Sequence, residues 1–151
     1  MKILGTYLTF LNESSEKESI LRIRKNEKAV WLYHTTEKKY VDNIKKNGLD
    51  PNFMGQEHAA YSQHPTGKPT LSYSSYKAYS KMYGGITLLV LVPTDNLFFA
   101  IHSKPKWYSR HGADEYLSTK IIEPKNIIFP NDKRYDEIEK ENSYLDTSLK
   151  L

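Results

Sequence analysis

Apolar residues along the chain gather into short runs whose lengths suit strands better than long helices. AVWLY (29–33), ITLLVLV (86–92) and LFFAI (97–101) fall within the length of about four to eight residues that is typical of buried strands. ITLLVLV is apolar on both faces, which predicts a central strand of a sheet. Further short strands are predicted in ILGTYLTFL (3–11), TLSY (70–73), EYLST (115–119) and IIEPKNIIF (121–129).

The best-defined unit is a strand followed by a helix. The strand predicted over AVWLY ends at His34. Thr35 or Thr36 is predicted to cap a helix with the interior EKKYVDNIKKN (37–47). Gly48 is placed where a helix commonly ends in a left-handed conformation. Three further helices are predicted: a short amphipathic one between Glu13 and Lys25, YKAYSKMY (76–83) capped by Ser74 or Ser75, and a peripheral one around Tyr135–Lys140.

The order of these elements predicts the fold class. Residues 51–69 are predicted to form a long irregular loop, and the later half of the chain is mostly strands. We expect one α+β domain over residues 1–151, with a split and largely antiparallel sheet. Its core would span about 30–130, with an N-terminal strand and helix extension and a charged C-terminal tail.

Composition and motifs exclude several kinds of chemistry. The chain has no cysteine, so a thiolate nucleophile and a zinc–thiolate site are excluded. Its five histidines are dispersed, and we expect no metal cofactor. Neither GxGxxG nor a Walker-type phosphate loop is present, and HExxH and GxSxG are also missing. No apolar run approaches a membrane span, which favours a soluble cytoplasmic protein without a membrane partner. The net charge of +4 is compatible with an acidic partner.

Three segments together resemble the diphtheria-toxin/PARP-like (H-Y-E) branch of the ADP-ribosyltransferases. LYHTTEKKYVDNIKKNGL (32–49) is similar to the family's first motif, a strand ending in Tyr-His followed by a helix that closes with Gly-Leu. TLSYSSYKAYSKMYGGITLLVLV (70–92) resembles the second motif, and ADEYLSTKIIEPKNIIF (113–129) resembles the third, in which a Glu opens a strand. The resemblance spans roughly residues 30–130 and implies the family's fold and an NAD+-dependent transferase.

The resemblance also implies roles for individual residues. Glu115 would be the catalytic carboxylate, because a negative charge beside the ribose stabilises the cation that forms when nicotinamide leaves. His34 would hydrogen-bond the ribose on the adenosine side, and the main chain of Thr35 would hold the carboxamide of nicotinamide. The family usually has Gly where this chain has Thr35. Tyr73 and Tyr83 are the two candidates for stacking on nicotinamide, and Tyr73 is preferred because it ends a strand.

The segment before Glu115 bears on the acceptor of ADP-ribose. Arginine-specific members of the wider family have Glu or Gln two residues before the catalytic Glu, whereas this chain has Ala113. In family terms the preceding loop meets the target. Basic and aromatic residues alternate in it, which suits phosphates and an unstacked base. The candidate substrate-binding residues there are Lys106, Trp107, Tyr108, Arg110 and His111.

We therefore expect a mono-ADP-ribosyltransferase that modifies DNA or RNA in preference to protein. Its architecture resembles that of DarT-type toxins and related prokaryotic or phage enzymes, which implies a neutralising antitoxin as a further partner. The alternatives on the same fold are an NAD+ glycohydrolase and a catalytically inactive NAD+-binding or interaction module. An RNA 2′-phosphotransferase is less favoured because the core motifs carry few arginines.

Overall fold

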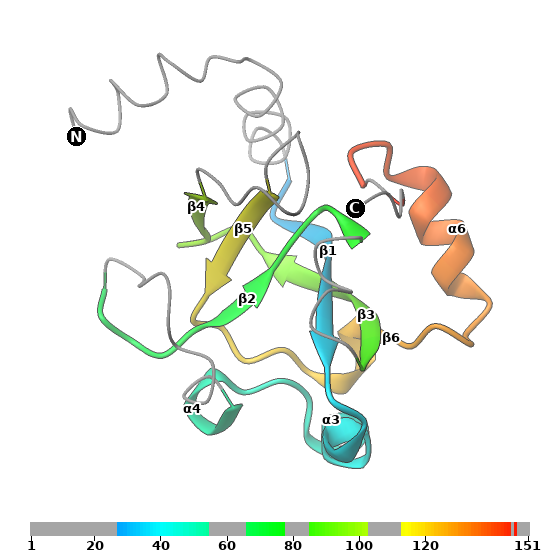
Figure 1. Cartoon of the computed structure of the whole chain (residues 1–151), viewed down its shortest axis with the longest axis horizontal. Coiled ribbons are helices and arrows are strands. Elements are labelled where there is room, and N and C mark those ends of the chain that lie inside the picture. Colours follow the sequence, from blue (N-terminus) through cyan, green and yellow to red (C-terminus); the bar gives the residue numbers. More distant parts are fainter. Residues whose placement is uncertain (1–26, 55–65, 78–84, 103–112, 146, 148–151) are drawn as a thin grey trace.

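The computed structural model of the chain describes residues 27–54, 66–77, 85–102, 113–145 and 147 (Figure 1). The strands are β1 (Ala29–Thr36), β2 (Leu71–Tyr73), β3 (Ile86–Pro93), β4 (Phe98–His102), β5 (Ala113–Ser118) and β6 (Ile127–Ile128). The helices are η1 (Lys38–Tyr40), α3 (Val41–Asn47), α4 (Pro51–Met54), η3 (Pro124–Asn126) and α6 (Arg134–Glu141), where η marks a 3-10 helix. The elements predicted before residue 27 lie outside the described residues, as does most of the helix predicted over 76–83.

The strands form two sheets of three strands each. One has the order β1-β3-β6 and the other the order β2-β5-β4, and every pair is antiparallel. β3 is central in its sheet, as its uniformly apolar sequence predicts, and pairs with β1 over eight residues from Thr36↔Ile86 to Ala29↔Pro93. The predicted α+β class with a divided, mostly antiparallel sheet is confirmed.

Within the described residues, a single main-chain bridge joins the two sheets. The amide of Tyr33 in β1 donates to the carbonyl oxygen of Ser74 over 2.8 Å, and the amide of Ser74 donates back to Tyr33 over 3.0 Å. On the same edge of β1, the Tyr144 hydroxyl accepts from the amide of Trp31 at 2.8 Å and donates to its carbonyl oxygen at 3.0 Å. β1 is therefore paired along its length with β3, and within the described residues one main-chain bridge connects it to Ser74, the residue that follows β2.

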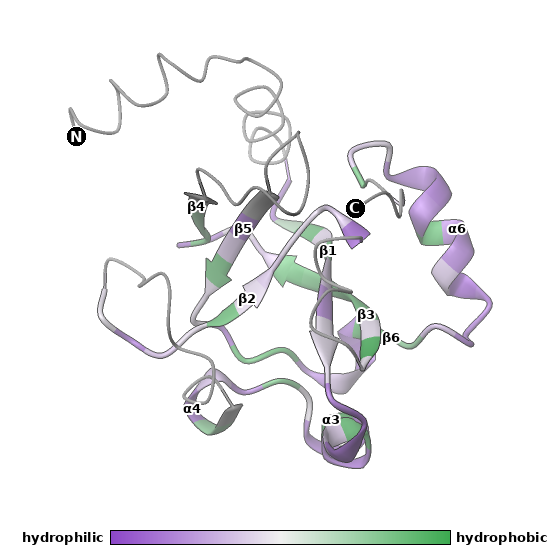
Figure 2. Cartoon of the chain, viewed as in Figure 1, coloured by the Kyte–Doolittle hydropathy of each residue, from purple (hydrophilic) through white to green (hydrophobic). Residues whose placement is uncertain are grey.

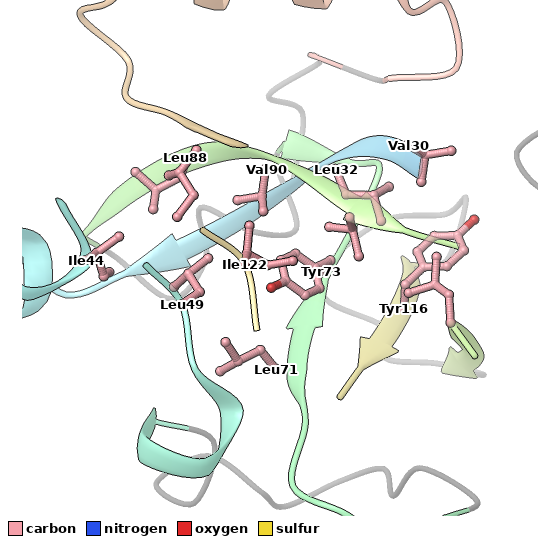
Figure 3. Close-up of a cluster of buried hydrophobic side chains, with 13 residues drawn as sticks. Val30, Leu32, Ile44, Leu49, Leu71, Tyr73, Leu88, Val90, Tyr116 and Ile122 are labelled. Carbon is pink, nitrogen blue, oxygen red and sulfur yellow. The ribbon is translucent and has the colours of Figure 1, made fainter. Parts of the chain in front are cut away.

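The core lies on both faces of β1 and β3, because alternate residues point to opposite faces of a strand. Val30 and Leu32 face the larger cluster, which also holds Leu88, Val90 and Tyr73 (Figure 3). The second cluster lies under α6 and consists of Tyr33, Leu89, Ile128, Tyr135 and Leu145. Most residues of α6 are hydrophilic, in contrast to those of β3 (Figure 2). α6 therefore covers one face of the sheet through few side chains.

The start of the first helix differs from the prediction. Neither Thr35 nor Thr36 caps it, because both belong to β1 and pair with Thr87 and Ile86 of β3. η1 begins after Glu37 without a side-chain cap. The predicted helix end is confirmed: Gly48 follows α3 with φ of 81°. A Cβ atom at Gly48 would lie 2.0 Å from the carbonyl oxygen of Ile122, so the close approach of these two segments also requires glycine.

The prediction of a long irregular loop over residues 51–69 is wrong for its first residues. Pro51–Met54 form α4, and residues 55–65 lie outside the described part of the chain. Asp50 favours this turn because its carboxylate accepts from the amide of Asn52 at 2.9 Å. Among the helices in the described ranges, none has the length and apolar character needed to cross a membrane.

Candidate functional site

His34 lies near the end of β1 and contacts the neighbouring strand. Its Nδ1 is 2.9 Å from the carbonyl oxygen of Ser72 in β2. A carbonyl oxygen only accepts hydrogen bonds, so Nδ1 is the donor, and in the neutral ring Nε2 is then the acceptor nitrogen. The His34 ring also lies 5.3 Å from the ring of Tyr73 between centroids, at 46°. The imidazole is thus held in one orientation by β2.

Glu115 lies in the middle of β5 and is buried, with 8% of its surface exposed. The Ser72 hydroxyl donates to Oε2 of Glu115 over 2.5 Å. The register of β2 and β5 explains this contact. Ser72 is opposite Leu117, and Glu115 precedes Leu117 by two residues. Ser72 and Glu115 are therefore diagonal neighbours on one face of the pair. A buried carboxylate needs such donors, and Ser72 supplies one of them.

Ser72 therefore connects the two principal candidates. Its carbonyl oxygen meets the His34 ring at the edge of the strand, and its hydroxyl meets the Glu115 carboxylate on one face. Sequence reasoning missed this residue. The available signal was the alternation of Leu71 and Tyr73 with Ser72 and Ser74, which predicts one apolar face and one polar face for β2.

Tyr73 belongs to the core. It is 1% exposed and points among Leu49, Leu71 and Ile122 (Figure 3). Burial raises the pKa of its hydroxyl well above the ordinary value. That hydroxyl has no hydrogen-bond partner within the described part of the chain. A ring with this exposure presents no open face to a nicotinamide, so the preference for Tyr73 over Tyr83 as the stacking residue is not supported by its position.

Thr35 is fixed by β3. Its hydroxyl lies 2.8 Å from that of Thr87, the residue directly opposite in the register. Successive residues of a strand direct their main-chain groups to alternate edges. Tyr33 directs both its amide and its carbonyl group toward β2, so Thr35, two residues later, directs its own groups to that same edge. The main chain of Thr35 thus faces the edge of β1 that is directed toward β2.

The remaining candidates lie outside the described residues. They are Tyr83 and the loop residues Lys106, Trp107, Tyr108, Arg110 and His111. Within the described ranges, no three His, Asp or Glu side chains are grouped as metal ligands would be. A cavity of about 250 Å³ beside α3 and α4 is lined by Asn43, Asn47, Gly48, Asp50 and Phe53, and so does not include His34, Ser72 or Glu115.

Comparisons with known proteins add no relative. No protein-family model, curated protein or solved structure matches the chain at a significant level.

Proposed function

We propose that this chain cleaves NAD+ and transfers ADP-ribose to a macromolecular acceptor, with Glu115 as the essential carboxylate. The observation that supports this most is the position of Ser72, which contacts both His34 and Glu115. These two residues come from different sheets and are distant in sequence, yet the motif resemblance requires them to serve one cofactor. An ordinary surface glutamate would be solvated, whereas Glu115 is buried and oriented.

The chemistry requires a fixed negative charge. The bond between the ribose C1′ and the nicotinamide nitrogen breaks, and its electron pair goes to the ring, which leaves as neutral nicotinamide. Positive charge develops on the ribose, and the Glu115 carboxylate would stabilise that charge while accepting from the 2′-hydroxyl. The acceptor then supplies the electron pair of the new bond to C1′ and gives up a proton. Ser72 holds the carboxylate in place before the reaction, which reduces the reorganisation needed in the transition state.

His34 and Thr35 would position NAD+ rather than take part in bond breaking. With Nδ1 donating to Ser72, the Nε2 of His34 is suited to accept a hydrogen bond from a ribose hydroxyl. The main chain of Thr35 faces the edge of β1 on which β2 lies, where it would hold the nicotinamide carboxamide. NAD+ would then lie along this edge of β1, and we assign the stacking contact to Tyr83.

For the acceptor we propose nucleic acid, met by Lys106, Trp107, Tyr108, Arg110 and His111. The composition of this segment supports it, since cations bind phosphates and aromatic rings stack on bases. The reaction would take place in the cytoplasm of the producing or target cell, and an antitoxin that blocks it would be a natural partner.

The decisive experiment follows the label of NAD+ that is isotopically labelled in its adenosine part. The chain is incubated with this NAD+ and with separate pools of DNA, RNA and protein. Label in DNA or RNA supports the proposal in full. Label confined to protein retains the transferase and excludes the nucleic-acid acceptor. Release of nicotinamide without label in any pool indicates a glycohydrolase, and the absence of both indicates an inactive binding module.

A further inference from the structure

The junction between the two sheets is the pair Tyr33 and Ser74, and a side chain of α6 also contacts it. Glu139 of α6 accepts two hydrogen bonds at Oε2, one from the Tyr33 hydroxyl at 2.6 Å and one from the Lys77 ammonium at 3.0 Å. The two charged side chains are largely buried, with 22% of Lys77 and 13% of Glu139 exposed. An ion pair shielded to this extent is screened less by salt than a surface pair.

Aromatic rings complete the surroundings of the Lys77 ammonium. It lies 4.9 Å from the centre of the Tyr135 ring and 5.9 Å from that of Tyr33. Tyr135 is itself fixed, because its hydroxyl donates to the carbonyl oxygen of Thr87 in β3 at 2.9 Å. Two rings and one carboxylate therefore confine the cation, and cation–π attraction adds to the ion pair.

These contacts, together with the main chain, link Tyr33, Ser74, Lys77 and Glu139 in a closed ring of interactions. Tyr33 bonds to Ser74 through both main-chain groups and to Glu139 through its hydroxyl. Lys77 follows Ser74 by three residues and returns to the same carboxylate oxygen. Glu139 thus connects β1 with the segment that follows β2, beside the Tyr33–Ser74 bridge. A shift of β2 along β1 would break the Lys77 contact, the Tyr33 contact or both.

We propose that Glu139 is a positioning residue for the candidate site, acting through this junction on His34 and Ser72. His34 adjoins Tyr33 in β1, and Ser72 precedes Ser74 by two residues, so the register at the bridge sets the distance between the ring and Ser72. The proposal rests on the proposed NAD+ chemistry, and its consequence is that α6 governs cofactor binding without touching the cofactor.

Hydrogen exchange provides a readout that does not depend on activity. The amides of Tyr33 and Ser74 report the junction. The chain also contains a matched reference, because Leu49 and Ile122 form a second isolated bridge with two mutual bonds of 2.9 Å. In Glu139→Ala we expect exchange at the junction to accelerate about tenfold while the reference bridge is unchanged, since loss of a buried charged partner raises local opening.

Steady-state kinetics tests the effect on the site. Glu139→Ala is expected to raise the KM for NAD+ with little change in kcat, as removal of a positioning contact should. Glu139→Gln retains an acceptor for Tyr33 but loses the charge opposite Lys77, so its effects should be intermediate. Glu137→Ala, on the exposed side of the same helix, is the control and should behave like the unaltered chain.

Three results would overturn the proposal. Equal acceleration at both bridges would mean that Glu139 only stabilises the whole fold. Faster exchange at the junction with an unchanged KM would mean that the junction does not govern cofactor binding, and the transferase would stand. Failure of the unaltered chain to cleave NAD+ would remove both proposals, and this is detected before any substitution is made.

Discussion

The Ser72 hydroxyl donates to the Glu115 carboxylate over 2.5 Å, and the carbonyl oxygen of the same serine contacts the His34 ring. One residue thus sets the position of an acid from one sheet and an imidazole from the other. β2, which carries Ser72, has only three residues. Its position depends on its pairing with β5 and on the bridge to β1, so the geometry of the candidate site depends on the junction between the sheets.

Replacing Glu115 by Gln tests the essential carboxylate. The amide keeps the size of the side chain and can still accept from Ser72, but it removes the charge opposite the forming cation. We expect transfer to fall by at least about a hundredfold, with little change in NAD+ affinity, measured by calorimetry and single-turnover kinetics. Loss of both binding and folding in Glu115→Gln would instead identify a structural carboxylate.

Replacing His34 by Ala tests the assignment of this ring to cofactor positioning. The substitution removes the proposed contact to the ribose and the bond to the carbonyl oxygen of Ser72. We expect a larger rise in the KM for NAD+ than Glu115→Gln produces. Initial rates over a range of NAD+ concentrations decide this. A fall in kcat at unchanged KM would place His34 in the chemical step.

Trp107 tests the proposed acceptor. If its ring stacks on a base, Trp107→Ala should abolish modification of nucleic acid and leave slow NAD+ hydrolysis intact, because the ring serves the acceptor. Neutralising Lys106 and Arg110 should weaken binding to all sequences and flatten its dependence on salt. Both effects are measured with labelled oligonucleotides at several salt concentrations. Unaltered nucleic-acid modification in Trp107→Ala would contradict the assignment.

Gly48 tests the contact between α3 and the segment before η3. Gly48→Ala combines a positive φ with a Cβ atom 2.0 Å from the carbonyl oxygen of Ile122, and we expect it to lower the free energy of unfolding by at least about 2 kcal/mol. Gly67 is a matched control because its φ of 79° is similar and no atom lies within 4 Å of an added Cβ. Gly67→Ala should cost only about 1 kcal/mol. Urea unfolding of both variants gives the comparison, and equal costs would show that the close approach is relieved easily.

The Tyr73 hydroxyl has no hydrogen-bond partner within the described residues, and it tests whether such a buried group lowers the free energy of unfolding. Tyr73→Phe removes that group and should leave the free energy of unfolding unchanged or raise it by about 1 kcal/mol. Tyr135→Phe is the counterpart, because it removes a hydroxyl that donates to Thr87, and should cost about 1 to 2 kcal/mol. Similar decreases in the free energy of unfolding of the two variants, measured by urea unfolding, would mean that the Tyr73 hydroxyl has a partner such as an ordered water.

Local patterns in the sequence predicted most of the elements. β3 follows directly from the apolar pattern, and the peripheral helix predicted around Tyr135–Lys140 is observed as Arg134–Glu141. The end of α3 follows from the conformational freedom of Gly48. The strand predicted over AVWLY ends at His34, whereas β1 continues to Thr36 because β3 also pairs with Thr35 and Thr36. Pairing across a sheet overrides the tendency of threonine to begin a helix.

Contacts between distant segments could not be predicted from the sequence pattern. Nothing local indicates that Ser72 binds both His34 and Glu115, because that contact depends on the register of three strands. The same is true of Glu139 and Lys77, which resemble any exposed pair of charges in the sequence. Burial of Tyr73 could in principle have been predicted, since Leu71 and Tyr73 occupy alternate positions and share one face.

The Tyr144 hydroxyl has a consequence for association between molecules. It satisfies the amide and the carbonyl oxygen of Trp31 at the edge of β1, where a neighbouring strand would otherwise form hydrogen bonds. An uncovered strand edge is a template on which a second polypeptide can add, and this is a common origin of aggregation. A single phenol thus occupies the hydrogen-bonding groups of Trp31 and blocks the addition of a further strand at this position.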